Sequence, residues 1–181
     1  MANNAELILR TLDRHLTEPA AVRLYGGAAM ILAYGRPRST EDADLLMDDR
    51  EAQVLIDHGF SEALEKANAE LEAADLYIAH IFGPEQVILG LSWRDHCRPV
   101  DLAGLRYLSL TALGPIDMVL SKLGRGDEGD LADITWLLDR ERLSADAVRA
   151  AVASAQVPEV MSRVFELARE RLFAVLAKRP A

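Results

Sequence analysis

The sequence predicts an α/β (α+β) fold, with a small mixed sheet flanked by helices and a C-terminal helical bundle. Up to residue 114, short segments of alternating apolar and polar residues are interspersed with segments of helical spacing. From Pro115 onward only helical spacing recurs, interrupted by turns. We therefore expect a core over residues 1–114 and a helical extension over residues 115–181, packed on the core as a single compact unit.

The expected elements follow from apolar periodicity and turn residues. An amphipathic helix is expected over residues 3–16, and Pro19 follows its end. A strand over 22–25 then leads into a glycine pair, and a later strand carries Asp42 and Asp44. An acidic connection is expected after residue 48. Further helices are expected at 28–34, 61–71, 145–155 and 159–177, and further strands at 77–82, 87–91 and 105–113.

The negative charge of the chain is concentrated in one segment. Of a formal net charge of −9 over 181 residues, residues 41–75 contribute 12 acidic against 2 basic side chains. A clustered acidic surface repels phosphodiester backbones, so we expect no extended nucleic-acid surface. A nucleotide bound through metal ions stays compatible with this charge, because the ions reverse the local sign. Solubility is the alternative explanation of an acidic helix face.

Composition also indicates the compartment. No apolar run is long enough to span a bilayer, and residues 1–16 lack the basic start and cleavage site of a secretory signal. Cys97 is the single cysteine, which excludes an internal disulfide and is typical of a reducing environment. We expect a cytoplasmic protein without membrane contact.

The chemistry is expected between residues 22 and 47. Side chains two apart on a strand share a face, so Asp42 and Asp44 point to one place, where they are able to hold divalent metal ions. Gly26 and Gly27 allow a tight turn from strand into helix, and the N–H groups of the helix start attract an anion. The structural alternative is an ordinary glycine turn beside a solvated strand end.

A basic turn precedes the two carboxylates. Arg38 is suited to hold a triphosphate, or alternatively to balance the nearby acidic residues. Thr40 offers a hydroxyl close to Asp42, which alternatively serves only to shape the turn.

Gly26-Gly27, a short helix, a basic turn and then Asp42-x-Asp44-Leu45 resemble the minimal nucleotidyltransferases of the DNA polymerase β-like superfamily. The similarity is to bacterial families related to the AbiE-type abortive-infection toxins, including one of unknown function. The resemblance implies transfer of a nucleoside monophosphate from a nucleoside triphosphate to an acceptor hydroxyl. It implies two magnesium ions on Asp42 and Asp44, and phosphate at Gly26, Gly27, Arg38 and Thr40. The acceptor is left open between RNA, protein and a small molecule.

The resemblance also implies a third acidic residue on a neighbouring strand. Asp101 is the candidate for this catalytic and metal-binding role, and Asp95 is its competitor. An exposed strand aspartate beside Arg98 is the simpler alternative.

A second block, residues 116–138, also resembles the family. By that resemblance Lys122 and Asp130 lie near the nucleotide, and Lys122 contacts phosphate and acts in catalysis by stabilising developing charge. Asp130 or Asp133 orients Lys122 or Arg125 through an ion pair. Asp130 and Asp133 lie three apart and share a helix face. The structural alternative is a charged helix-turn-helix that closes on the sheet.

Two further functions stay open. One is a catalytically inactive nucleotidyltransferase-fold binding protein, since Gly26-Gly27 stands where many active relatives have Gly-Ser. The other is one component of a toxin–antitoxin pair, whose companion is a small protein. A homodimer is a separate possibility for the partner of this chain.

Overall fold

The computed structural model describes residues 3–179 and divides the chain into two compact units. The sheet unit comprises Met1–Gly83 and Arg98–Ala112, and the helical unit comprises Pro84–Cys97 and Leu113–Ala181. The boundary expected after residue 114 lies close to the point between Ala112 and Leu113, where the chain leaves the sheet unit for the last time. Residues 84–97, however, were expected in the core and belong to the helical unit. How the helical part packs on the core stays a prediction.

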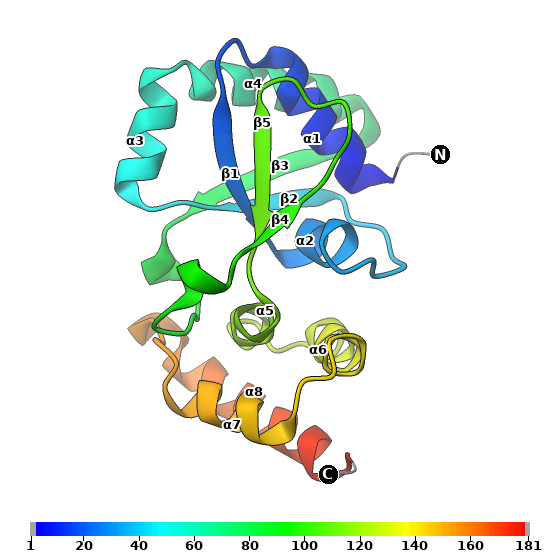
Figure 1. The fold of residues 1–181 in the computed structure, drawn as a ribbon, viewed down its shortest axis with the longest axis vertical. Coiled ribbons are helices and arrows are strands. Elements are labelled where there is room, and N and C mark those ends of the chain that lie inside the picture. The colour runs from blue at the N-terminus through cyan, green and yellow to red at the C-terminus, as the bar shows by residue number, and fades with distance from the viewer. Residues whose placement is uncertain (1–2, 180–181) are drawn as a thin grey trace. The chain divides into compact units, whose positions relative to one another are not determined.

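The sheet unit contains a five-stranded mixed sheet with the order β3-β2-β1-β5-β4 (Figure 1). The central strand β1 pairs parallel with β5 and antiparallel with β2. Edge strand β3 pairs parallel with β2, and edge strand β4 pairs antiparallel with β5. The predicted mixed sheet is therefore confirmed. The strands are β1 (Ala20–Tyr25), β2 (Asp42–Leu46), β3 (Tyr77–Phe82), β4 (Arg98–Val100) and β5 (Leu108–Ala112).

Alternation along the strands separates a core face from a second face. In β1, Val22 and Leu24 are buried, whereas Tyr25 is half-buried. In β2, Ala43 and Leu45 are fully buried. Leu24 lies opposite Leu45 in the register, so both strands direct their apolar residues to the same side.

Helices α1 (Asn4–His15) and α4 (Phe60–Leu71) pack on each other, α1 against β2 and α4 against β3. Helix α1 confirms the predicted amphipathic helix, and Asn3 caps it by accepting a hydrogen bond from the Glu6 backbone. Buried Asp13 accepts the backbone N–H groups of residues 106–108 and so holds the start of β5.

Two elements differ from the sequence-based expectation. The acidic connection contains helix α3 (Asp49–Asp57), begun by a capping box between Asp48 and Glu51. The strand expected at 87–91 is wrong. Its backbone makes only an isolated bridge between Leu89 and Gln156, so the apolar run reflects burial in the helical unit.

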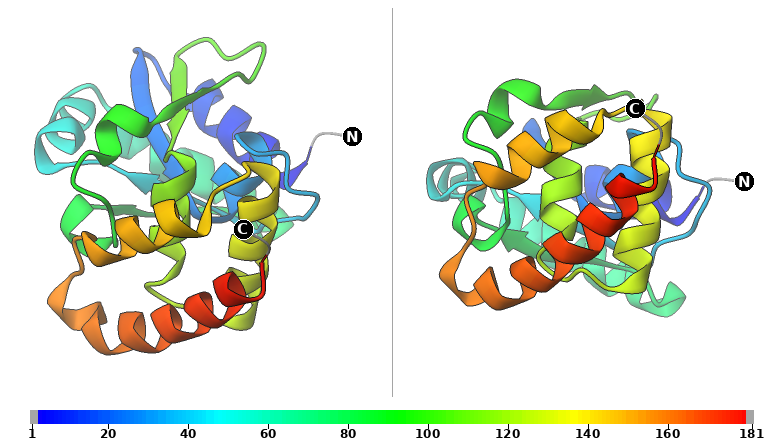
Figure 2. Two further views of the ribbon diagram at one scale, coloured as in Figure 1. Left: turned by 60° about the horizontal axis from the view of Figure 1, so that its bottom comes forward. Right: turned by 90° about the horizontal axis from the view of Figure 1, so that it is seen from below.

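The helical unit is built around four helices, seen from two further sides in Figure 2, where α7 and α8 run alongside each other. Pro115 occupies the first turn of α5, as expected. Ser144 caps α7 by accepting a hydrogen bond from the Ala147 backbone. The helices are α5 (Pro115–Lys122), α6 (Glu128–Arg140), α7 (Ala145–Ala153) and α8 (Ser162–Ala177), with the 3-10 turns η2 (Pro84–Gln86), η3 (Trp93–His96) and η4 (Glu159–Met161).

Within residues 3–179, no helix has both the length and the apolar character that crossing a membrane requires.

Candidate functional site

Asp42 and Asp44 lie at the start of β2, on the face of the sheet opposite the apolar core. Both are half-buried, and fully buried Ala43 between them points to the other face. The register places Tyr25 beside Asp44 and Tyr77 beside Asp42. Because paired residues in a sheet share a face, two carboxylates and two phenols gather where β1 ends and where β2 and β3 begin.

Gly26 makes room for Asp44. Its φ of 67° lies in the left-handed region, and a Cβ atom built on it would stand 2.3 Å from Oδ2 of Asp44. Both the backbone angle and the carboxylate therefore require glycine at this position. Helix α2 (Gly26–Leu32) begins here, and Tyr25 before it makes no side-chain cap hydrogen bond.

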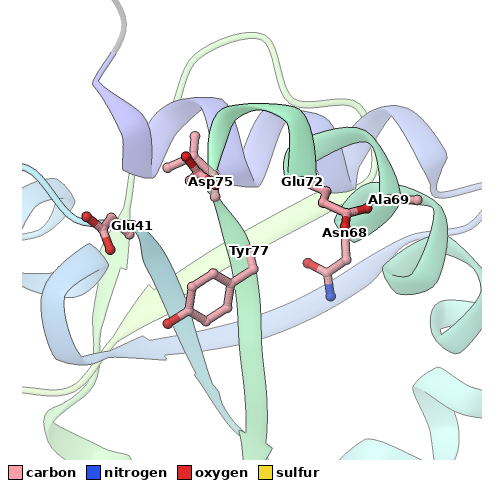
Figure 3. Close-up of a pocket in the computed structure, with 7 residues that line it drawn as sticks. Glu41, Asn68, Ala69, Glu72, Asp75 and Tyr77 are labelled. Atoms are coloured by element: carbon pink, nitrogen blue, oxygen red, sulfur yellow. The ribbon is translucent and has the colours of Figure 1, made fainter.

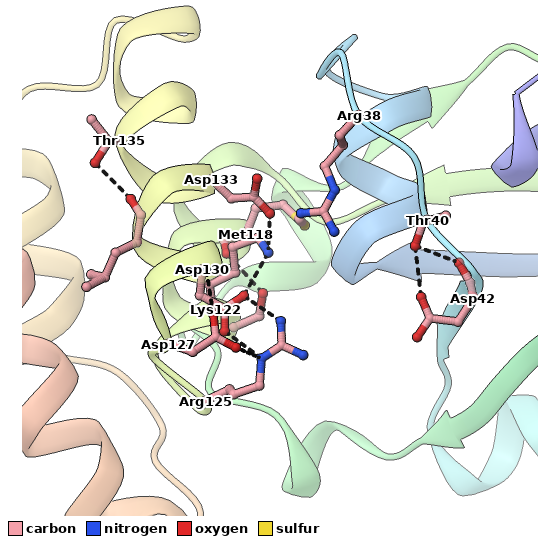
Figure 4. Close-up of polar contacts among 12 residues, drawn as sticks. Arg38, Thr40, Asp42, Met118, Lys122, Arg125, Asp127, Asp130, Asp133 and Thr135 are labelled. Carbon is pink, nitrogen blue, oxygen red and sulfur yellow. Dashed lines mark hydrogen bonds and ion pairs between the residues drawn. The ribbon is translucent and has the colours of Figure 1, made fainter.

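Gly27 makes room for Thr40. A Cβ atom on Gly27 would lie 2.6 Å from Oγ1 of Thr40 and 3.7 Å from a guanidinium nitrogen of Arg38. Thr40 Oγ1 donates to Oδ1 of Asp42 at 2.9 Å, which fixes the orientation of that carboxylate (Figure 4). The two glycines thus connect the basic turn and the carboxylate pair in one compact site.

The turn that carries Arg38 and Thr40 is held by α1. The Asn4 side-chain amide donates to Thr40 O at 3.0 Å and to Ser39 Oγ at 3.1 Å. Thr40 is 6 % exposed, whereas Arg38 is exposed. The turn therefore has a fixed backbone and presents its arginine side chain to solvent.

Tyr25 and Tyr77 belong to this site although the sequence did not single them out. Burial, followed by the charges of Asp44 and Asp42, raises the pKa of Tyr25 above its usual value. For Tyr77 the Asp42 charge is the largest cause of a raised pKa. Both phenols stay neutral beside a negative field. Only the strand register reveals them, and no local motif does.

A β-bulge lies opposite Asp44. The pairing of β2 with β3 shifts between Ala43 and Leu45, so β3 has one extra residue at this point. Bulges re-aim a side chain relative to its neighbours and are enriched beside active sites.

The structure does not bring Asp101 to the carboxylate pair. Asp101 follows Val100, which pairs with Leu110 of β5, and Leu110 in turn pairs with Val22 near the start of β1. Asp44 instead pairs with Tyr25, at the end of β1. The offset amounts to about 13 Å along the strands and about 14 Å across them. Asp101 is exposed, as in the alternative of a surface charge.

The helical unit holds a second charged cluster, formed by Lys122 of α5 with Asp130 and Asp133 of α6. Lys122 Nζ lies 3.0 Å from Asp130 and 2.8 Å from Asp133 (Figure 4). All three side chains are at least 94 % buried. The predicted ion pairing and the shared helix face are therefore confirmed. Asp95, the competitor for the third carboxylate, lies exposed on η3.

Arg125 completes the cluster from the solvent side. Its Nε lies 2.9 Å from Asp130 Oδ2, and its Nη2 donates to Oδ1 at 3.0 Å. Burial raises the pKa of Asp130, but the hydrogen bond from Arg125 and the Lys122 charge outweigh it, so the pKa is lowered. Asp127 caps α6 by accepting from the Asp130 backbone. The contacts cross-link α5 and α6, and phosphate contact by Lys122 stays a prediction.

The donor set of the sheet unit fits Mg²⁺ held jointly with a nucleotide. Mg²⁺ prefers oxygen ligands and is commonly bound through one or two carboxylates together with substrate phosphates. Asp42 and Asp44 supply that number. Among residues 3–179, no group of three or more His, Cys, Asp or Glu residues is placed to hold a metal ion without such help.

The chain belongs to the family described as "Nucleotidyltransferase of unknown function (DUF6036)", whose model matches residues 4–173. The match spans both units, so the helical unit is part of the family pattern. The family description supports transferase activity with a nucleotide substrate. No curated protein and no solved structure matches the chain.

Proposed function

We propose that this protein is a metal-dependent nucleotidyltransferase that moves a nucleoside monophosphate from a nucleoside triphosphate to an acceptor hydroxyl. The observation that supports it best is the fit of Gly26 against Asp44 and of Gly27 against Thr40. Glycine turn, basic turn and carboxylate pair were predicted together between residues 22 and 47, and their close packing in a member of a nucleotidyltransferase family supports the proposal.

Each residue of the site has a role in this proposal. Gly26 and Gly27 let Asp44 and Thr40 lie against the start of α2, where the phosphate binds, and Arg38 binds its oxygens from the exposed side of the turn. Thr40 orients Asp42 by its hydrogen bond. The raised pKa of Tyr25 keeps the phenol uncharged, so it adds no repulsion toward the triphosphate.

In the reaction a bond forms between the acceptor oxygen and the α-phosphorus, and the bond from the α-phosphorus to the bridging oxygen of pyrophosphate breaks. The hydroxyl proton passes to a base or to water, and pyrophosphate leaves with both electrons of the broken bond. Mg²⁺ bound by Asp42 and Asp44 would neutralise charge on the phosphates. The protein contributes mainly position, because it places both carboxylates and the arginine before substrate arrives.

Lys122 and Asp130 are assigned to the nucleotide by family resemblance. Two carboxylates already contact the Lys122 ammonium, which reduces the charge it has to offer a phosphate. In our proposal Lys122 therefore carries only a small share of phosphate binding.

Transfer of label from α-³²P-labelled nucleoside triphosphates, in the presence of Mg²⁺, tests the proposal. Asp42→Ala and Asp44→Asn should each lower the rate at least about 10³-fold while the protein stays folded. Asp101→Asn is the matched control, because it removes a carboxylate at the other end of the same sheet. Unchanged transfer in the Asp42 and Asp44 variants would refute the assignment.

A second candidate is a nucleotide-binding protein of the same fold without catalysis. The position of Asp101 favours it, because the register leaves the pair without that third carboxylate. Mg²⁺-dependent thermal stabilisation by a nucleoside triphosphate, without any label transfer to acceptors, would identify the binder.

We also propose the finer relationship, to the DNA polymerase β-like superfamily and to AbiE-type toxins. A toxin of this kind should arrest growth when expressed alone, and the product of an adjacent gene should relieve the arrest. Normal growth on strong expression of active protein would argue against the toxin role.

A further inference from the structure

A cavity opens at the start of β3, beside the carboxylate pair. Its volume is about 570 Å³, within the range of small-molecule sites. Figure 3 shows Tyr77 on β3, Glu41 at the entry to β2, and Asn68 on α4 around it. The remaining lining residues are Ala69, Glu72, Asp75 and Leu76.

The surface of this cavity is mostly apolar, and exposed acidic residues surround it. Glu41, Glu72 and Asp75 supply three carboxylates, and none of the seven lining residues is basic. The Asn68 side chain exchanges two hydrogen bonds with the Ile78 backbone, which ties α4 to β3. A phosphate group would meet only negative charge here, whereas a cation would be attracted.

Tyr77 connects the cavity to the carboxylate pair. It lines the cavity and lies opposite Asp42 in the strand register. Its backbone N–H donates to Glu41 O at 3.0 Å, so cavity wall and β2 are joined at this point. The side chain is 47 % exposed and offers an aromatic face to a ligand. Tyr77 is therefore the residue that the cavity lining shares with the strand register of Asp42.

We propose that this cavity is the acceptor site and that the acceptor is a small molecule carrying protonated amines and a hydroxyl group. The inference rests on the proposed function and names its substrate class. The amines bind among Glu41, Glu72 and Asp75, and an amine over the Tyr77 ring gains cation–π attraction. The hydroxyl faces Asp42, where its oxygen forms the bond to the α-phosphorus as pyrophosphate leaves.

In this proposal the two substrates occupy different surfaces, one that binds an anion and one that binds a cation. The triphosphate binds at the glycine turn with Arg38, and the cationic acceptor binds on the acidic side beyond Tyr77. This division disfavours RNA as the acceptor, because its phosphodiesters would be repelled by the three cavity carboxylates. The hollow is open rather than enclosed, and its volume of about 570 Å³ lies within the range of small-molecule sites.

Binding is tested first, without nucleotide. The probe is 1,3-diamino-2-propanol, titrated by NMR at neutral pH and low salt, with glycerol as the neutral comparison. The triple variant Glu41→Gln, Glu72→Gln, Asp75→Asn should weaken diamine binding about ten-fold. The control variant Asp57→Asn, Glu62→Gln, Glu65→Gln removes the same charge outside the cavity and should bind normally. Equal binding by both triple variants would overturn the inference.

Transfer is tested second, with α-³²P-labelled nucleoside triphosphate and Mg²⁺. Label on the diamino alcohol, lost in the cavity variant and kept in the control variant, is the expected result. Label on RNA or glycerol instead would overturn the acceptor class while the proposed function stands. Cavity-dependent binding of the diamine without transfer to any acceptor would leave the cation site in place and refute the proposed function.

Discussion

Two pairs of aspartates differ in their surroundings. Asp42 and Asp44 lie two apart on a strand, and Asp130 and Asp133 lie three apart on a helix, so in each pair both carboxylates share one side of their element. Asp42 and Asp44 are half-buried beside glycines and neutral tyrosines. Asp130 and Asp133 are each 2 % exposed and both contact Lys122. Burial and then the charges of the first pair raise the pKa of Tyr25, and the Asp42 charge is the largest cause of the raised pKa of Tyr77. The pKa of Asp130, in contrast, is lowered by Arg125 and Lys122 against the effect of burial.

The difference shows that spacing alone does not define a site. A buried pair that is matched by lysine and arginine holds two helices together and has its charge balanced by the protein. The field of a half-buried pair is felt by the neighbouring phenols. In our proposal the sheet-unit pair is the binding site, whereas the helical-unit pair cross-links α5 and α6.

The largest expected effect on stability follows from removing Lys122. Lys122→Met leaves two buried carboxylates without their shared cation and should lower the free energy of unfolding by about 3–5 kcal/mol, measured in urea. Asp42→Asn keeps the oxygen that accepts from Thr40, so its unfolding free energy should stay within about 0.5 kcal/mol of wild type.

A triple variant controls for this interpretation. Lys122→Met with Asp130→Asn and Asp133→Asn removes cation and carboxylates together and should recover most of the lost stability. If Lys122→Met is as stable as wild type, Lys122 does not serve as a cross-link and its role in phosphate binding gains weight.

Gly26→Ala should have the next largest effect. Gly26 and Gly35 both have positive φ, 67° and 75°, but a Cβ atom meets Asp44 only at Gly26 and nothing within 4 Å at Gly35. Gly35→Ala should cost about 1–2 kcal/mol from backbone strain alone. Gly26→Ala should cost at least about 1 kcal/mol more, and should also impair nucleotide transfer by displacing Asp44. Equal losses of stability, with transfer intact in both, would show that the glycine is needed only for its backbone angle.

The smallest expected effect is a difference between Asp130→Asn and wild type in how stability falls with pH. Because the pKa of Asp130 lies below its usual 3.8 in the folded protein, its stabilising contribution is complete above that value. The contribution is lost as pH falls through the lowered folded-state pKa. Urea midpoints measured between pH 5 and pH 2 should fall less steeply for Asp130→Asn than for wild type. Parallel slopes would mean that the ion pairs do not perturb this carboxyl.

The sequence predicted those parts of the site that depend on local spacing. Gly26 and Gly27 begin α2, Thr40 lies in the turn, and Asp42 and Asp44 lie in β2. Alternation and turn chemistry were enough to bring them together. The mixed sheet and the helical C-terminal part followed in the same way from periodicity.

Features that depend on register could not be predicted. Tyr25 and Tyr77 join the site only because β1 and β3 pair with β2 in the observed alignment. Asp101 has suitable chemistry, but the direction of β4 places it at the other end of the sheet. Helix α3 was missed although its capping box was visible in the residues, because the acidic composition suggested a connection.

The sheet unit is made from two separate stretches of the chain. Strand β5 is the parallel partner of β1 and belongs to the second stretch. The two stretches are separated in the sequence by Pro84–Cys97, which belongs to the helical unit. Asp13 of α1 receives its three backbone hydrogen bonds from residues that follow this excursion. During synthesis, the first 83 residues emerge before β5, so one edge of β1 has no paired strand. The Asp13 carboxylate likewise lacks its backbone donors until residues 106–108 have been made. The sheet is therefore completed only once the segment after Cys97 has left the ribosome, because β5 and the donors to Asp13 belong to that segment.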